Sequence, residues 1–175
     1  MRTLPPPAEQ PTPKVGAEID GEVAARATTA VKAWKKVEAK VFPLAPALAK
    51  SDVGKWLLRA LPVASVTESP HLSADRTGPD AAFGALFAAA ANGGAHDPGL
   101  GGAYGRRAAW TSFAALVGAP EGTSPDDVDS HARGCGFVLF RGAGGWFFDV
   151  AWDVGVLALR ADGASCAVVA ATDSD

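Results

Sequence analysis

Asp149 and Asp153 are the two residues of this chain best suited by type and spacing to acid–base chemistry. Either carboxyl group could serve as a general acid or a general base, and a neighbouring tryptophan can raise the pKa of a carboxyl group into the useful range. Arg106 could hold an anionic substrate, because its planar guanidinium donates paired hydrogen bonds to oxyanions. Tyr104 or His96 could donate a proton. Together they are candidates for an enzyme pocket that acts on a small polar or anionic substrate.

The sequence contains no complete catalytic or ligand-binding fingerprint. A nucleophile–base pair, a metal-binding cluster and a phosphate-binding loop cannot be assembled from it. His71, His96 and His131 are scattered and lack short spacing to cysteine, which argues against a zinc site, and no cofactor is expected. The main prediction is therefore a non-catalytic binding or interaction protein for an unknown protein partner or a small polar ligand. A small cofactor-independent enzyme is the alternative.

An antiparallel sheet near the carboxyl end of the chain must position the two aspartates. Three runs rich in Val, Phe and Trp, at 136–141, 146–160 and 165–173, are separated by glycine-containing turns. An alternating segment at 37–41 fits a further short edge strand, and continuation of the preceding helix is the competing interpretation. The predicted sheet is a β-meander of three to four strands.

A two-residue turn at Asp162–Gly163 would fix the register of the last hairpin. It places Asp153 opposite Thr172. If the middle strand begins at residue 146, Asp149 and Asp153 share one face and lie about 13 Å apart, at about 3.3 Å per residue. Two interpretations are open for that face: solvated carboxylates at the edge of the sheet, or carboxylates that are covered by a helix and need partners.

Helical patterns dominate the chain upstream of that sheet. Apolar residues recur at helical spacing, with capping or helix-ending residues at the boundaries. The predicted helices cover residues 19–34, a short stretch around 56–58, 81–91, 100–117, and a segment from 125 that ends before 134. Residues 65–79 are rich in Ser, Thr and Pro and predict turns. The fold class is therefore α+β, with N-terminal helices packed on a C-terminal antiparallel β-meander.

The 100–117 helix is the element expected to bring a cation to the aspartates. Arg106 and Trp110 lie on one helical stripe, so the guanidinium is drawn toward the core and needs a carboxylate. We hypothesise that this helix packs across the Asp149–Asp153 face and that Arg106 pairs with one of the two. The contact would be either a buried ion pair that fixes the helix, or part of a polar pocket with Tyr104.

Glycines cluster where the chain enters this helix, at Gly99, Gly101, Gly102 and Gly105. They indicate either close packing or backbone N–H groups offered to an anion. The run is not a dinucleotide-binding fingerprint, because it follows no predicted strand and has Tyr104 where a third glycine is required.

The domain organisation predicted from composition is simple. Residues 1–14 form a Pro-rich segment that is expected to be a disordered tail, and residues 15–175 are long enough for a single α+β domain. No apolar run reaches membrane-spanning length, and the start of the chain lacks the apolar region of a signal peptide. A cytoplasmic protein is predicted.

The two cysteines agree with that compartment. In the register above, Cys135 and Cys166 lie about 23 Å apart along the sheet. A disulfide requires Cα atoms within about 7 Å, so two free thiols are expected.

Charge is segregated along the sequence. Residues 1–60 hold seven lysines and three arginines against six acidic residues, whereas residues 61–175 hold six arginines against thirteen acidic residues. The lysines at 32–55 could mark a partner-binding surface, or simply a solvated helix face. Nucleic-acid binding is not expected, because the lysines lack interleaved exposed aromatic residues and the net charge is −3.

Two features of the sheet bear on partners and ligands. An exposed strand at 37–41 or 136–141 could pair with a second copy of the chain and form a homodimer. Asp173 would lie opposite Trp152 on the core face, which an ionised carboxylate resists, so an acidic frayed end is predicted. A metal-binding tip is the alternative.

Three strings of this sequence carry a family resemblance: Gly-Gly-Ala-Tyr-Gly-Arg-Arg and the residues that follow to 118, Trp-Phe-Phe-Asp-Val-Ala-Trp and the residues that follow to 160, and Ala-Val-Val-Ala-Ala-Thr-Asp-Ser-Asp at 167–175. They resemble an uncharacterised actinobacterial domain-of-unknown-function family, and residues 15–42 resemble the region that precedes it. High Ala, Gly, Pro and Arg content suits such a source. The resemblance implies no activity and no catalytic residues.

Overall fold

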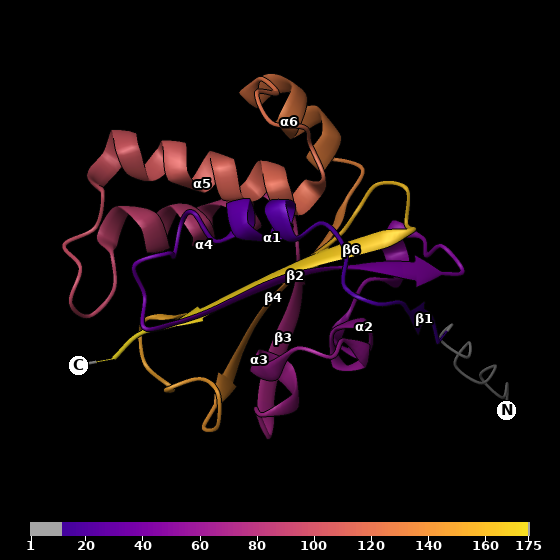
Figure 1. Cartoon of the computed structure of the whole chain (residues 1–175), viewed down its shortest axis with the longest axis horizontal. Coiled ribbons are helices and arrows are strands. Elements are labelled where there is room, and N and C mark those ends of the chain that lie inside the picture. Colours follow the sequence, from indigo (N-terminus) through magenta and orange to yellow (C-terminus); the bar gives the residue numbers. More distant parts are fainter. Residues whose placement is uncertain (1–11, 175) are drawn as a thin grey trace, which may run out of the picture.

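A six-stranded antiparallel sheet runs through the centre of the computed structural model, which describes residues 12–174 (Figure 1). The sheet has the strand order β1-β2-β6-β5-β4-β3 and curls into a half-barrel. Its strands are β1 (Lys14–Val15), β2 (Lys36–Ala45), β3 (His71–Thr77), β4 (Gly136–Ala143), β5 (Asp153–Leu159) and β6 (Ser165–Thr172).

Helices cover both faces of this sheet. Residues 12–174 form the α-helices α1 (Gly21–Ala27), α2 (Lys55–Ala60), α3 (Ala64–Thr67), α4 (Pro79–Asn92), α5 (Gly101–Val117) and α6 (Pro125–Ala132), and the 3₁₀ turn η1 (Lys50–Asp52). Figure 1 shows α1, α4 and α5 on one side of the sheet and α2 and α3 on the other. Each side has its own apolar core, so the central strands are buried on both faces.

The last hairpin has the predicted register. Asp153 pairs with Thr172 as predicted. The predicted two-residue turn is wrong, since the cross-strand bond nearest the turn joins Arg160 N–H to Ser165 O and residues 161–164 form the loop. Gly163 in this loop has a positive φ of 67°, which suits a residue without a side chain. Helices α4 and α5 are confirmed close to their predicted bounds, and α6 begins after Ser124, whose hydroxyl accepts the N–H of Asp127 at 3.3 Å. Local turn and capping chemistry therefore predicted this register and these helices correctly.

The predicted middle strand is wrong in its first half, because β5 begins only at Asp153. Asp149 has a left-handed backbone with φ of 60°, and the Asp153 carboxylate accepts the N–H of Val150 at 3.1 Å. Such side-chain-to-backbone bonds compete with a strand ladder. Trp146 and Phe147 do not alternate between faces, since both are buried in the core beneath α2 and α3. Asp149 and Asp153 therefore do not share a strand face.

The sheet is larger than a C-terminal meander, because β2 and β3 come from the first half of the chain. The strand interpretation of 37–41 is confirmed over a longer range, but β2 is not an edge strand. It pairs with β6 on one side, and on the other it carries β1 and the bridge from Ile19 to Val41. Pro43 is tolerated within β2 because its missing N–H faces away from β6, on the side where its carbonyl accepts the N–H of Gly16.

Strand β3 lies in the segment that predicted only turns. Its sequence contains Ser73, Asp75 and Arg76, which do not give an apolar alternation. Polar residues are acceptable here because β3 ends the strand order and one side of it is exposed. The predicted homodimer strand at 136–141, by contrast, is β4, which lies between β3 and β5 and has no free side.

The amino-terminal predictions are only partly correct. Helix α1 ends at Ala27 rather than Trp34, because the hydroxyls of Thr28 and Thr29 donate to the preceding carbonyls and the chain continues in turns. Asp20 is not a side-chain cap and has a φ of 54°. Most of the predicted 1–14 tail lies outside the described residues, but Lys14 belongs to β1 and pairs with Ala45.

The carboxyl end is not frayed. The side chain of Asp173 is 3% exposed, and its carboxylate accepts backbone N–H groups from Lys35 and Ala95. Asp173 does follow the predicted register, since its N–H donates to Trp152 O at 3.3 Å. Burial of this carboxylate is acceptable because amide donors replace water.

Candidate functional site

The hypothesised contact between Arg106 and the aspartates is not formed. Helix α5 packs on the sheet face of Val156 and Ala158, whereas Asp153 alternates with them along β5. The Arg106 guanidinium lies 5.9 Å from the centre of the Phe87 ring, and within residues 12–174 it makes no ion pair. The guanidinium can stay near the apolar core because a charged head can lie against an aromatic face while still in contact with water.

The other three candidate residues are separated from Arg106. Tyr104 is 71% exposed. Asp153 bonds to the Thr172 hydroxyl and, with Asp75 and Arg141, lines a pocket of about 260 Å³. Asp149 lines a different hollow of about 570 Å³. The structure therefore does not bring Arg106, Tyr104, Asp149 and Asp153 into one pocket.

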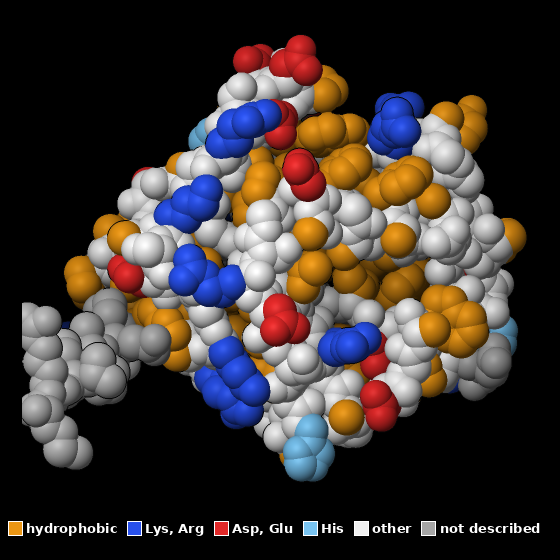
Figure 2. Space-filling model, turned by 180° about the vertical axis from the view of Figure 1, so that it is seen from behind, with side chains coloured by type: hydrophobic (Ala, Val, Ile, Leu, Met, Phe, Trp, Pro, Cys, Tyr) orange, Lys and Arg blue, Asp and Glu red, His pale blue; other side chains and the backbone are white. Residues whose placement is uncertain are grey.

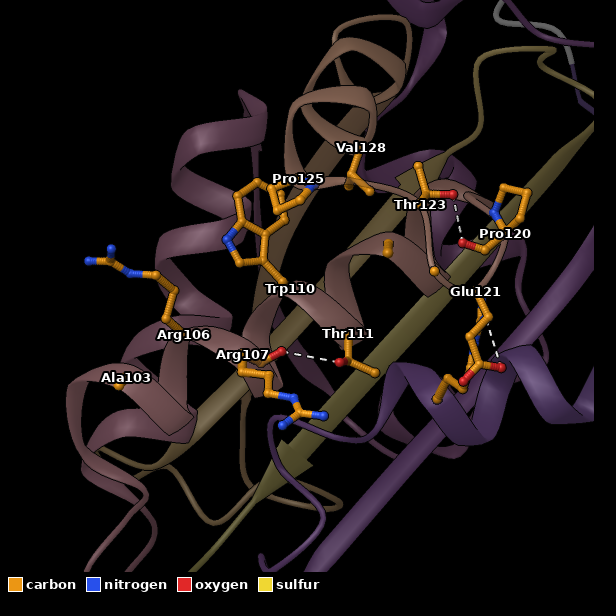
Figure 3. A pocket seen from close by; sticks show the side chains of 13 residues that line it. Ala103, Arg106, Arg107, Trp110, Thr111, Pro120, Glu121, Thr123, Pro125 and Val128 are labelled. Carbon is orange, nitrogen blue, oxygen red and sulfur yellow. Dashed lines mark hydrogen bonds and ion pairs between the residues drawn. The ribbon is translucent and has the colours of Figure 1, made fainter.

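Arg106 instead lines a different pocket, which we call the α5–α6 pocket (Figure 3). It has a volume of about 640 Å³ and lies between α5, α6, the 118–124 loop and the side chain of Arg26 from α1. Its apolar lining comes from Ala103, Trp110, Ala114, Pro120, Pro125 and Val128. Its polar lining comes from Arg26, Arg106, Arg107, Thr111, Glu121 and Thr123.

Positive charge predominates in the lining of the α5–α6 pocket, because it includes three arginines and one carboxylate. Arg26 donates to Ala119 O at 3.2 Å and lies 3.8 Å from the Glu121 carboxylate, while its Nε is buried without a hydrogen-bond partner among the residues described. Glu121 is 87% exposed, so this ion pair contributes at most about 1 kcal/mol. Arg107 has no ion pair within residues 12–174.

Helical spacing explains how α5 presents this lining. Arg106 and Trp110 are one turn apart, and so are Arg107 and Thr111, whose hydroxyl donates to Arg107 O at 3.1 Å. In Figure 3 the two guanidinium groups extend from opposite sides of α5, and Trp110 lies beside Pro125. The two consecutive arginines therefore place one cation on each side of α5, with Arg106 beside Phe87 at the margin of the pocket.

Trp110 forms the apolar wall of the pocket and is held in place from behind. Its ring centre lies 4.5 Å from that of Phe83 and 5.9 Å from that of Phe113, in tilted and edge-on arrangements. These contacts restrict the indole to one orientation, while part of it remains accessible. The pocket thus combines a flat apolar surface with cationic side chains.

Arg26, Arg107 and Glu121 are the lining residues that the sequence did not single out. Arg26 and Glu121 are far apart in the chain and meet only because α1 packs against α5. A local signal existed for Arg107, since two adjacent arginines on a helix cannot both face the same side.

The two cysteines are free and buried, one on each side of the sheet. Burial raises the pKa of the Cys135 thiol from 9.0 to about 11 and that of the Cys166 thiol to about 12. Both thiols are therefore protonated in the folded protein at neutral pH and are poor nucleophiles. They are structural residues of the two cores.

These raised pKa values predict that stability falls at alkaline pH. Below pH 9 the thiols are protonated in both states, whereas between pH 9 and about 11 they ionise only in the unfolded chain. The free energy of unfolding should then fall by up to about 1.4 kcal/mol per pH unit for each thiol. Urea unfolding at pH 8, 9 and 10 measures this slope. A Cys135→Ala/Cys166→Ala variant should show a shallower slope, and an equal slope would contradict the assignment.

In the described part of the chain, no three His, Cys, Asp or Glu side chains lie close enough together to hold a metal ion. None of the described helices is both long enough and apolar enough to cross a membrane.

Comparison with known proteins gives a family but no activity. No curated protein matches the chain, and no solved structure does. A family described as a family of unknown function, DUF6183, matches residues 1–175. The expectation of a domain of unknown function is therefore confirmed, without a taxon. The chain belongs, over its whole length, to the DUF6183 family.

Proposed function

We propose that this protein is a non-catalytic binding protein whose α5–α6 pocket takes a small ligand that joins an anionic group to a flat apolar part. One observation carries the proposal: three arginines and a single carboxylate line the same pocket as the partly accessible indole of Trp110. Arginine binds oxyanions through paired hydrogen bonds, and an indole face stacks on flat apolar groups. The pocket volume of about 640 Å³ falls in the range of small-ligand sites.

The alternative of a cofactor-independent enzyme has less support. A general acid or base must lie within hydrogen-bond reach of the reacting proton. Asp149 and Asp153 line two other pockets, and the one carboxylate of the α5–α6 pocket, Glu121, is largely exposed beside Arg26. A pocket that holds cations without a positioned base favours binding over catalysis.

The probe that tests the proposal is 8-anilinonaphthalene-1-sulfonate, an aromatic anion whose fluorescence rises on binding. N-phenyl-1-naphthylamine is the matched control probe, because it lacks only the sulfonate. We expect the wild-type chain to bind the sulfonate more tightly than the neutral probe. An Arg106→Gln/Arg107→Gln variant should bind the sulfonate about tenfold more weakly, which corresponds to about 1.4 kcal/mol, and should bind the neutral probe unchanged.

A Lys32→Gln variant is the matched control protein, because Lys32 is exposed and lies outside the pocket. It should bind both probes as the wild-type chain does. Equal sulfonate affinity in the double arginine variant would refute the proposal, as would wild-type protein that shows no preference for the anion. Near-ultraviolet circular dichroism establishes that each variant keeps its packed aromatic residues.

A further inference from the structure

Strand β3 leaves one side of the sheet open. It ends the strand order, and no strand of residues 12–174 pairs with its outer side. The register shows which backbone groups face outward. At the β5–β6 turn the N–H of Arg160 donates to Ser165 O, so this pair is hydrogen-bonded. Successive residues of a strand in an antiparallel sheet bond alternately to the strand on one side and to the strand on the other, and the strand registers extend this alternation from β5 to β3. Residues 71, 73, 75 and 77 therefore bond to β4, while Leu72, Ala74 and Arg76 present their N–H and C=O groups outward.

A hydrogen bond from a lysine confirms that these backbone groups face outward. The Lys55 ammonium donates to Leu72 O at 2.5 Å, so that carbonyl does face away from β4. In the described residues no protein group bonds to the outward N–H and C=O of Ala74 and Arg76. A row of free, extended backbone groups is the structural requirement for strand addition by a partner.

Cations line this open edge, in what we call the β3-edge groove. One hollow of about 540 Å³ is lined by Lys55, Arg59 and Arg76 beside Trp56, with Asp52 as the acidic residue. Asp52 is already engaged, since its carboxylate accepts the N–H of Ala49 at 3.1 Å. The three cations make no ion pair within residues 12–174. The hollow thus has unneutralised positive charge on a chain whose net charge is −3.

The positive groove continues along the strand. A second hollow of about 570 Å³ shares Lys55 and Arg59 with the first and adds His71 and Arg141, with Asp149 as its one acidic residue. Figure 2 shows Lys and Arg side chains gathered on the side of the molecule where α2 and β3 lie. Cationic side chains therefore lie along β3, beside its unbonded backbone groups.

We propose that the β3-edge groove is a docking site for an extended segment of a partner protein that carries an acidic residue at every second position. The segment adds to β3 as a further strand, and its backbone bonds to Ala74 and Arg76. Side chains of a strand alternate between faces. One face of the added strand meets the cations around Arg76. The other lies on the side of Ser73 and Asp75, where the two carboxylates of Asp75 and Asp153 outnumber the one cation, Arg141, and disfavour an acidic side chain.

Charge argues against a second copy of this chain as the occupant. Two β3 edges brought together would place Arg76 and the α2 cations of both copies side by side, which is repulsive. An acidic strand neutralises the same groups, and its carboxylates can form paired hydrogen bonds with Arg59 and Arg76. The inference is independent of the α5–α6 pocket, because the two sites share no residue.

The test uses the full chain and two fluorescein-labelled peptides of the same composition. One alternates Glu and Thr over about ten residues, and the other has all its Glu residues first and all its Thr residues after them. Fluorescence anisotropy should show that the alternating peptide binds at least tenfold more tightly than the block peptide. An Arg59→Glu/Arg76→Glu variant should lose at least tenfold in affinity for the alternating peptide, and a Lys32→Glu control should not. Equal binding of the two peptides would show that affinity depends only on total charge and not on the alternation of acidic residues, and would overturn the proposal.

Hydrogen exchange tests the backbone pairing without any substitution. On addition of the alternating peptide, exchange of the Ala74 and Arg76 amides should slow, while the Ser73 and Asp75 amides, already bonded to β4, should change little. An Ala74→Pro variant removes one outward N–H without removing a bond to β4, and should weaken binding about tenfold. Unchanged exchange at Ala74 and Arg76 would overturn strand addition. Self-association through this edge, seen as a concentration-dependent sedimentation coefficient that Ala74→Pro abolishes, would overturn the choice of partner.

Discussion

The free energy of unfolding of an Asp173→Ala variant is expected to be about 3 kcal/mol lower than that of the wild-type chain. The buried Asp173 carboxylate accepts three backbone N–H groups, from Lys35 at 3.3 Å, Ala95 at 2.9 Å and Ser174 at 3.1 Å. Lys35 precedes β2, and Ala95 lies in the loop between α4 and α5. One carboxylate thus ties the end of β6 to two segments, and alanine would leave their amides without an acceptor.

Urea unfolding followed by tryptophan fluorescence measures this loss. An Asp126→Ala variant is the matched control, because Asp126 is exposed in the first turn of α6, and its removal should change the free energy of unfolding by about 0.5 kcal/mol or less. An Asp173→Asn variant keeps one carbonyl acceptor and should lie between alanine and wild type. A loss below about 1 kcal/mol for Asp173→Ala would show that water replaces the carboxylate at these amides.

The second large effect is expected at Gly105, where α4 and α5 approach each other closely. A Cβ atom on Gly105 would lie 2.8 Å from Ala91 Cα, which is backbone and cannot move independently. Gly105→Ala should therefore lower the free energy of unfolding by about 2 kcal/mol, in the range of overpacked cores, despite the better helix propensity of alanine. This close approach favours packing as the reason for glycine at that position.

Gly102 provides a control of opposite sign on the same helix. A Cβ atom there would meet nothing within 4 Å, so Gly102→Ala adds helix propensity without a clash and should raise the free energy of unfolding by about 0.5 kcal/mol. The same urea unfolding experiment measures both variants. If the two substitutions changed stability in the same direction, the contact between Gly105 and Ala91 would not be the cause.

Helix α5 shows why the Arg106 hypothesis was wrong although the helix was correctly predicted. Trp110 and Phe113 do pack inward, in an aromatic group with Phe83. Arg106 lies on the same stripe but near the start of the helix, where its side chain reaches the solvent beside Phe87. Helical periodicity gives the direction in which a side chain leaves the helix, but it does not show how far the core extends along it.

Local chemistry was enough to predict the elements that are closed by their own turn and capping residues. The loop centred on Asp162–Gly163 fixed the register of β5 with β6, and Ser124 with Pro125 marked the start of α6, because these interactions join residues that are close in the chain. The α+β class followed from the same signals. The strand β2 could be predicted from its alternation, although its place inside the sheet could not.

Only the tertiary structure decided where the polar residues gather. The 146–152 segment is held out of the strand by the local bond from Val150 to Asp153 and also by Thr172 of the neighbouring strand, whose hydroxyl bonds to Asp153 and to the N–H of Phe148. Strand β3 exists because β4 offers it a partner 60 or more residues away in the sequence, and its polar composition hides it from any local pattern. The cations of the two proposed sites come from segments that are distant in the chain. They lie close together because separate helices and strands pack against one another, and sequence periodicity indicates only which face of a single helix or strand is buried.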